Sequence, residues 1–157
     1  MVKKHQIGLF IKTADTYKRI KKSTSLTISM NPETETFDFI ADESPSEELK
    51  TYKPTIDQDL AMYKEEEDYK LIWPYFYEQK TGSQAHVTTM IVFMQEPESG
   101  GGYKAWETDS VLSVQDLNAV DGKLNFQLLF GGTTKKGSAT ITEAGVVTFT
   151  ETKPSGV

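Results

Sequence analysis

The stretch "VTTMIVFM", Val87 to Met94, has the alternation of a β-strand but is apolar on both of its faces. One face would carry Val87, Ile91 and Phe93, and the other would carry Met90, Val92 and Met94. A strand of this kind has to be covered on both sides, by a helix, by a second sheet or by another subunit. We therefore expect this strand to be packed on both of its faces.

The segment before this strand is the best helix candidate in the chain. We expect a helix over about residues 65–80, with acidic residues in its first turn and Lys80 and Gly82 at its exit. Pro74 should kink this helix or limit its length. The spacing i, i+3, i+4, i+7 and i+8 predicts one apolar face, packed against the sheet, that consists of Tyr69, Ile72, Trp73, Phe76 and Tyr77.

Period-two alternation dominates the chain after residue 22 and predicts a mainly β protein. Residues 26–30 and 37–39 predict one hairpin, with its turn at Asn31, Pro32 and Glu33. Residues 124–130 predict a strand between the turn signals 121–122 and 131–132. A last hairpin is expected over residues 139–149.

The composition is that of one domain without disulfides. A chain of 157 residues can bury roughly 70% of its unfolded surface in a single core. There is no cysteine, so disulfides and cysteine-ligated zinc are excluded. The apolar run Ile7 to Ile11 is too short for a signal-peptide core or a membrane span, and we expect no membrane insertion.

Positive charge is concentrated at the start of the chain. Residues 1–22 hold seven basic residues and one acid, a net charge of +6, while the whole chain has −6 and the other 135 residues therefore carry −12. We divide the chain into a basic N-terminal arm, residues 1–22, and a domain, residues 23–157. The arm can bind nucleic acid, dock on an acidic surface of another copy, or remain a solvated tail; nucleic acid is the weakest of these, because the acidic domain repels phosphate.

The sequence gives no pattern of an active site, a metal site or a cofactor site. His5 and His86 have no ligand spacing between them, and cysteine nucleophiles are absent. "GGTTKKGS", residues 131–138, lacks the lysine and the following helix of a phosphate loop, and we interpret it as a hairpin loop. We expect a protein that is not an enzyme.

A polar, proline-bracketed segment interrupts the strands at residues 42–54. Here "FDFIADESPSEELKTYKPTIDQDLAMYKEEEDYKLIWPYF" resembles the major tail tube proteins of long-tailed, siphovirus-like bacteriophages. The matching elements are "ADESP" at residues 41–45, "ELKTYKP" at 48–54, "DQD" at 57–59 and "AMYK" at 61–64. Farther on, "GGGY" at 100–103 and "LNFQLLFGG" at 124–132 also look alike, so that the resemblance covers about residues 24–151.

The resemblance implies a small β-sandwich or barrel-like fold with one flanking α-helix. It implies a structural virion protein that forms hexameric rings around a β-barrel lumen, the rings stacking into the tail tube that conducts DNA into the host. The implied partners are further copies of the chain, the tape measure protein and other tail proteins, with viral DNA in transit but not bound specifically. Assembly is expected in the host cytoplasm. A tube inside a contractile sheath is the near alternative.

We expect two surfaces to serve this assembly. The extended loop 42–54 should reach a neighbouring subunit or ring, where the basic arm of another copy is its electrostatic counterpart. The predicted contact residues are Lys3, Lys4, Lys18, Arg19, Lys21 and Lys22 in the arm, and Asp42, Glu43, Pro45, Glu47, Glu48, Leu49, Tyr52 and Pro54 in the loop. The predicted lumen residues are Asn125, Gln127, Thr140, Thr142 and Thr148.

Two other classes of function remain open at this level. A carbohydrate-binding β-sandwich would use Trp73, Trp106 and several tyrosines as a stacking platform. A β-rich hydrolase would use a pair among the chain's carboxylates, although no particular pair stands out.

Overall fold

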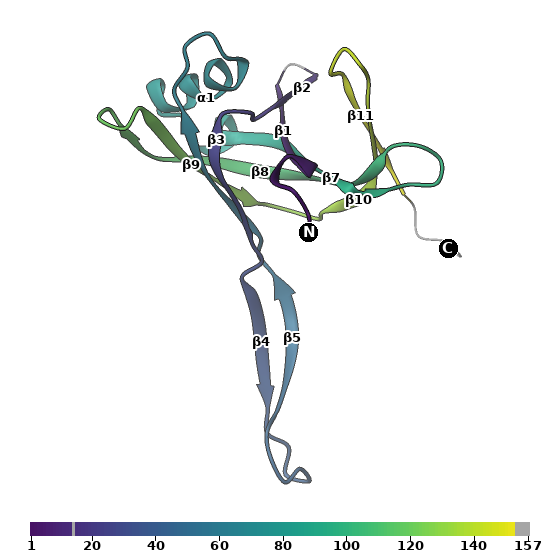
Figure 1. The fold of residues 1–157 in the computed structure, drawn as a ribbon. Helices are drawn as coiled ribbons and strands as arrows, with labels where there is room; N and C mark the ends of the chain where they lie inside the picture. Colours follow the sequence, from purple (N-terminus) through teal and green to yellow (C-terminus); the bar gives the residue numbers. More distant parts are fainter. Residues whose placement is uncertain (14, 153–157) are drawn as a thin grey trace.

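The computed structural model describes residues 1–13 and 15–152, which form a mainly β protein with one α-helix (Figure 1). The prediction of a mainly β fold with one flanking helix is confirmed. The elements in chain order are η1 (Lys4–Gln6), β1 (Ile7–Thr13), β2 (Thr16–Arg19), β3 (Ser23–Ser29), β4 (Pro32–Phe37), β5 (Ser46–Tyr52), β6 (Thr55–Ala61), α1 (Glu67–Tyr77), η2 (Gly82–Ala85), β7 (His86–Pro97), β8 (Tyr103–Asn118), β9 (Lys123–Phe130), β10 (Lys135–Ile141) and β11 (Val147–Glu151).

Nine of the strands form one curled antiparallel sheet. Its main path runs β2-β1-β7-β8-β9-β6-β3, and β10 and β11 branch from β8. The long strand β8 has two partners on one edge, since its residues 110–118 pair with β9 and its residues 103–107 pair with β10. The remaining strands, β4 and β5, pair only with each other.

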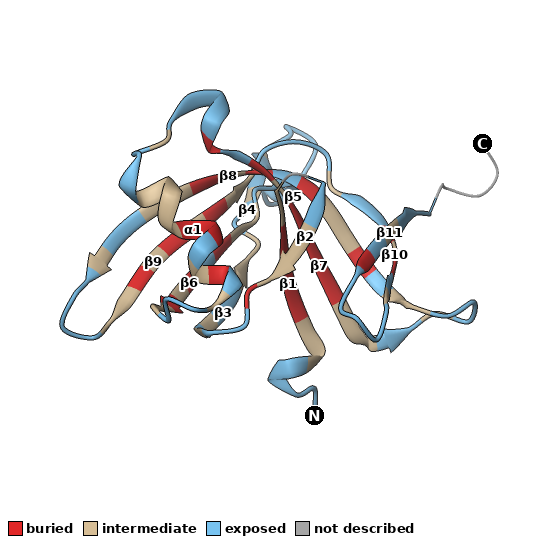
Figure 2. Cartoon of the chain, turned by 90° about the horizontal axis from the view of Figure 1, so that it is seen from above, coloured by how far each residue is buried: buried red, intermediate tan, exposed pale blue. Residues whose placement is uncertain are grey.

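Strand β7 is covered on both faces, as its sequence predicts. Val87 and Ile91 belong to a first core, which β1, β3, β6, β8, β9 and α1 enclose. Met90 and Val92 belong to a second core, which the hairpin β10–β11 closes from the other side with Ala139 and Val147. Figure 2 shows buried residues along β1, β7, β8, β9 and α1. The sheet therefore separates two cores.

Helix α1 is present where the sequence predicts it, although it is shorter. It spans Glu67–Tyr77 and includes Pro74. Leu71 and Ile72 are buried in the first core, with Phe76 packed against it. The predicted apolar face is therefore rotated: Trp73 stacks on Tyr69 and Tyr77 beside the core, and Tyr77 is 72% exposed.

The predicted hairpin of residues 26–30 with residues 37–39 is wrong. Strand β3 pairs with β6, and β4 pairs with β5. The chain does bend at Asn31, which has a positive φ of 45°. It continues outward, however, and Lys53 N–H donates to Met30 C=O beside this bend. The turn residues do bend the chain, but they do not determine which strand β3 pairs with.

The basic N-terminal segment is part of the fold and not a separate arm. Strand β1 pairs with β7 over residues 7–12, and Leu9, Phe10 and Ile11 are buried. The boundary expected at residue 22 therefore does not separate two structural units. The apolar run Ile7 to Ile11 lies in β1, between β2 and β7, and supplies side chains to both cores.

The loop after β9 is not a hairpin turn. Strands β9 and β10 both run antiparallel to β8 along the same edge, so residues 131–134 join two collinear segments. Gly131 N–H still donates to Asp109 C=O at 2.9 Å. The last hairpin is confirmed, with Thr142 N–H donating to Val146 C=O and Gly145 at a φ of 83°.

A buried carboxylate fixes α1 to the segment that leads into β3. Asp68 is 1% exposed, and its Oδ2 accepts hydrogen bonds from the backbone N–H groups of Lys21 and Lys22, each at 2.9 Å. Its Oδ1 accepts from Tyr69 N–H. Charge-assisted bonds of this kind are about twice as strong as neutral ones. Asp68 therefore positions both the helix and the start of β3.

We predict that Asp68→Asn lowers the free energy of unfolding by about 1–3 kcal/mol, because an amide NH₂ would face backbone donors in either orientation. The melting temperature should fall by about 2–4 °C for each kcal/mol in a chain of this size. Thermal unfolding followed by circular dichroism measures this. Glu67→Gln is the matched control, since Glu67 pairs with Lys18 at an exposed position and its loss should leave the melting temperature unchanged. Equal melting temperatures for Asp68→Asn and the natural sequence would contradict the role of Asp68.

Candidate assembly surfaces

The hairpin β4–β5 extends away from the rest of the molecule as a two-stranded ribbon (Figure 1). No residue of either strand is buried, and every residue of β5 is exposed. Its strands continue β3 and β6, which are in the main sheet. A lone two-stranded hairpin is marginally stable in water. The ribbon therefore lacks a core of its own.

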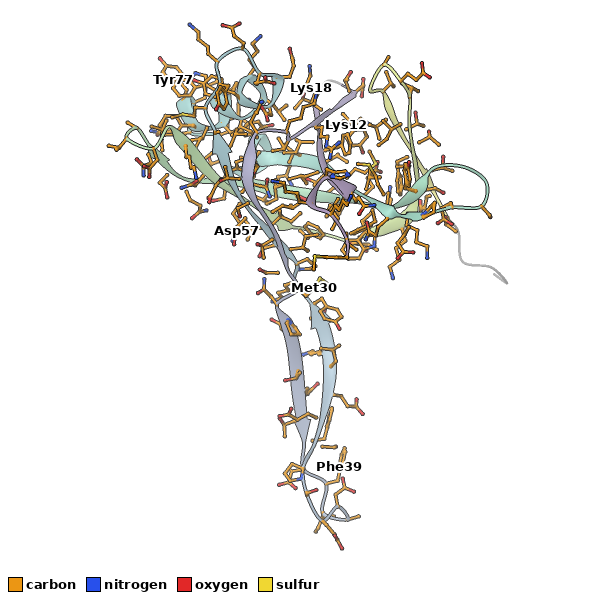
Figure 3. All side chains as sticks on the ribbon, in the orientation of Figure 1. Lys12, Lys18, Met30, Phe39, Asp57 and Tyr77 are labelled. Carbon is orange, nitrogen blue, oxygen red and sulfur yellow. The ribbon has the colours of Figure 1, made fainter. Side chains whose placement is uncertain are left out.

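Apolar side chains are exposed along this hairpin and at its tip. Phe37 and Phe39 stack with ring centroids 5.5 Å apart, and Phe39 is 57% exposed near the tip (Figure 3). Ile40 is fully exposed, and Leu49 is about half exposed. The predicted contact residues do not include Phe39 and Ile40, because the sequence pattern places Phe39 in a strand of the body. The signal that could have found them is "FDFI" directly before the acidic turn.

The predicted extended loop 42–54 is mostly a strand. Asp42, Glu43 and Pro45 lie at the tip of the hairpin. The next four predicted contact residues, Glu47, Glu48, Leu49 and Tyr52, lie in β5, and Pro54 lies at the junction with β6. These eight residues therefore spread over the full length of the hairpin.

The predicted basic contact residues lie on the body, apart from the acidic tip. Lys18 pairs with Glu67 at 2.7 Å and lowers the pKa of that carboxyl below its ordinary value. Arg19 donates to the His5 carbonyl oxygen at 3.1 Å. Lys3, Lys4, Lys21 and Lys22 are exposed. Across residues 1–13 and 15–152, no ion pair joins this basic set to the acids of the hairpin.

The first core is open along one side, between β1–β2 and β3. We call this groove the seam, and its volume is about 610 Å³. Its apolar lining includes Ile7, Leu9, Ile20, Leu26 and Ile28. Its polar and basic lining includes Lys4, His5, Arg19, Lys21 and Gln58. The seam therefore combines an apolar floor with a basic margin.

A polar surface covers the face of β6, β8 and β9 that is turned away from the first core. Asn125 donates to Asp116 Oδ1 at 2.7 Å, and Gln127 donates to Asp57 Oδ1 at 2.8 Å. Asp59 lies directly opposite Asn125 on β6. Acids and amides thus form one hydrogen-bonded surface around these two predicted lumen residues.

The other three predicted lumen residues lie elsewhere. Thr140 and Thr148 are direct partners in the hairpin β10–β11, and both are exposed beside the buried Ala139 and Val147. Since Ala139 and Gln127 are on the same side of the sheet by strand parity, Thr140 faces the opposite side. Thr142 begins the turn of this hairpin. The structure therefore does not bring the five residues together.

The two tryptophans do not form a shared stacking platform. Trp106 packs against the first core and meets Phe93 edge to face at 5.1 Å. Trp73 lies on α1 and stacks with Tyr69 and Tyr77. The ring faces of Trp73 are therefore partly occupied by neighbouring aromatic residues.

Tyr17 and Glu107 form a partly buried pair of titratable side chains. Burial, together with a hydrogen bond to Glu107, raises the pKa of the Tyr17 phenol above its ordinary value. This pair joins β2 to β8 beside the second core. Within the described part of the chain, no group of three or more His, Asp or Glu residues is placed to hold a metal ion. The same residues include no helix long and apolar enough to cross a membrane.

Comparison with known proteins gives no family assignment. No protein-family model matches the sequence, and no curated protein matches it. Among solved structures, the chain is similar to one in the cryo-EM structure of the anti-feeding prophage baseplate, symmetrised sixfold. The sequence identity is 8% and the TM-score is 0.45, over 87% of this chain and 95% of that one. A similarity of this size assigns neither a family nor a function.

We predict that the hairpin β4–β5 is less protected from hydrogen exchange than the main sheet in the isolated chain. Its backbone amides should exchange with solvent much faster than those of β7, since no residue of β4 or β5 is buried. Hydrogen exchange followed by mass spectrometry on peptides within residues 32–52 and 86–97 measures this difference. Equal protection of the two segments in a dilute monomer would show that the hairpin is stable by itself.

Proposed function

We propose that this protein is a structural subunit of a phage-type tail tube. Copies would form hexameric rings, and the rings would stack into a hollow tube that conducts DNA. The observation that carries this proposal is the hairpin β4–β5, which projects from the body with exposed apolar and acidic residues and no core. The sequence resemblance to major tail tube proteins supports the same function. We propose no catalytic activity.

The distribution of charge favours contacts between different ends of the molecule. The hairpin extends from one end of the body, whereas Lys12 and Lys18 lie at the other end (Figure 3). A contact between two different surfaces repeats from copy to copy and produces a stack instead of a closed dimer. The acidic tip and the part of the basic segment around Lys12 and Lys18 would then meet between copies.

The polar surface of β6, β8 and β9 fits the inner wall of such a tube. It presents Asp57, Asp59 and Asp116 around Asn125 and Gln127. Negative charge repels phosphate, so the duplex would not be held tightly by this wall. Helix α1 covers the opposite side of the first core and would face outward.

We predict that removal of the hairpin abolishes tube formation and leaves the body folded. Replacing residues 34–50 by Asn-Gly keeps the pairs Pro32 with Tyr52 and Glu33 with Thr51, and it closes the strands with a two-residue turn. The melting temperature should change little, because the hairpin buries no residue. Negative-stain electron microscopy at rising protein concentration should show rings or tubes only for the natural sequence.

Two point variants make this test sharper. Phe39→Ser with Ile40→Ser removes the apolar tip but keeps the hairpin, and it should also reduce tube formation. Val120→Ser removes an equally exposed apolar side chain from the β8–β9 connection and should have no effect. Normal tubes from the shortened protein would refute an assembly role for the hairpin. A natural protein that stays monomeric at all concentrations would refute the proposed function.

We further predict that Asp57→Lys with Asp59→Lys makes assembled tubes retain duplex DNA. Each substitution replaces a repulsive charge on the inner wall by an attractive one, and the retention should fall as salt rises. Co-sedimentation of tubes with a short duplex measures it. Glu65→Lys with Glu66→Lys, before α1, is the control with the same change in charge. Equal DNA retention by both variants would show that the β6 surface does not line the channel.

A further inference from the structure

We propose that the seam between β1–β2 and β3 is the receptor for the β4–β5 hairpin of a second copy. This inference rests on the proposed function and identifies the surface on which the hairpin docks. The seam is the groove of about 610 Å³ lined by Ile7, Leu9, Ile20 and Ile28, with Lys4, Arg19 and Lys21 among its basic residues.

The seam is a place where the sheet ends without closing. The main path of the sheet begins at β2 and ends at β3, and Ile20, directly after β2, and Ile28 in β3 both contribute to the first core. Strand β2 pairs with β1 from Phe10 onward, and Ile20 N–H still donates to Leu9 C=O at 2.9 Å, so the edge of β1 without a strand beside it is its start, Ile7 and Gly8. Strand β3 has β6 on one side only. Unpaired edges of this kind accept an additional strand from another chain.

The interior of the seam is apolar enough to hold side chains of an incoming strand. Leu9 and Ile20 are buried at its floor, and Ile7 and Ile28 are packed against the first core. Leu26 lines the same groove. It is on the same side of β3 as Ile28, which packs against the first core, yet it is 36% exposed. Apolar side chains placed here by a partner would complete the burial that the sheet leaves unfinished.

The β4–β5 hairpin has the complementary chemistry. Its acids Asp42, Glu43, Glu47 and Glu48 oppose the basic residues of the seam, and its exposed Phe39, Ile40 and Leu49 match the apolar floor. Within the described residues, no ion pair involves the side chains of Lys4, Lys21, Glu47 or Glu48. Both sets of charges therefore remain available for a partner.

The hairpin of the same chain does not occupy this seam. Strand β3 runs from Ser23, near α1, to Ser29 at the base of the hairpin, and the hairpin continues outward from there (Figure 1). A second copy stacked on the end of the body opposite the hairpin would bring its own hairpin toward the Lys21 end of the seam. Such a contact joins unlike ends and propagates along one axis.

Charge reversal with rescue tests the inference. Lys4→Glu with Lys21→Glu should raise the protein concentration needed for tube formation by about tenfold or more, since like charges across an interface cost free energy and each 1.4 kcal/mol is tenfold. Glu47→Lys with Glu48→Lys should have the same effect. An equimolar mixture of these two variants cannot restore every contact, so all four substitutions are combined in one chain, which should restore assembly to nearly the natural concentration.

Lys135→Glu with Lys136→Glu is the matched control. These lysines are exposed on β10, and Lys136 borders a different groove at the base of the hairpin, lined by Tyr52, Trp106 and Phe130. This control should assemble normally. Loss of assembly in the control, with rescue by Glu47→Lys and Glu48→Lys, would place the receptor at that groove and overturn the seam.

A crosslink gives a second readout that does not depend on charge. The chain has no cysteine, so Leu26→Cys and Ile40→Cys can be made in separate proteins and mixed under oxidising conditions. A disulfide-linked heterodimer is expected, whereas Val120→Cys mixed with Ile40→Cys should give none above background. The seam would be refuted if the natural protein forms tubes, the Lys4→Glu, Lys21→Glu variant assembles equally well and no crosslink forms. That result would leave the proposed function intact. Absence of tubes from the natural protein would instead refute the proposed function.

Discussion

The fold depends on burying both faces of β7. Val87 and Ile91 need one core, and Met90 and Val92 need another, so one layer of sheet has to be covered twice. The long strand β8 makes this possible because its two halves lead to different partners on the same edge. One half continues into β9, β6 and β3 around the first core, and the other half leads to β10 and β11 over the second core. The positions of β3, β6, β9, β10 and β11 follow from this division.

The same division explains why the first core needs a helix and remains open at one side. The sheet curls around this core but ends at β2 and β3 without joining them. Helix α1 covers part of the opening, and Asp68 holds it to the backbone of Lys21 and Lys22. The seam is the part that α1 does not cover. In a monomer, the unpaired edges of an unclosed sheet invite aggregation. In a protein that gains strands from its neighbours, the same edges are useful.

The sequence predicts those features that local chemistry determines. The alternation from Val87 to Met94 predicts two covered faces, and the turn residues around Gly145 predict the last hairpin; both are confirmed. Strand pairing is different, because it depends on contacts between distant segments. The bend at Asn31 suggests a return of the chain, but β6 pairs better with β3 since Ile56 and Ile28 both face the first core. Likewise, the basic residues around the apolar run Ile7 to Ile11 make it look like part of a separate arm. Its partner strand β7 lies about 80 residues away in the sequence, so local patterns do not reveal the pairing.

For the candidate surfaces too, the sequence predicts local features, whereas features that depend on distant segments need the structure. The acids of residues 42–48 are visible in the sequence, whereas the exposure of Phe39 and Ile40 depends on whether a strand lies beside them. A hairpin without apolar support would be expected to fray, and charge alone does not remove that problem. The structure supplies one surface with the missing properties, an apolar floor between two unpaired strand edges with basic residues around it. In the proposed tube, stacking would then use the hairpin and the seam, while ring closure would use other edges of the body such as β11 and the part of β8 beyond β7. Because these surfaces are separate, lengthening the stack would not compete with closing the ring.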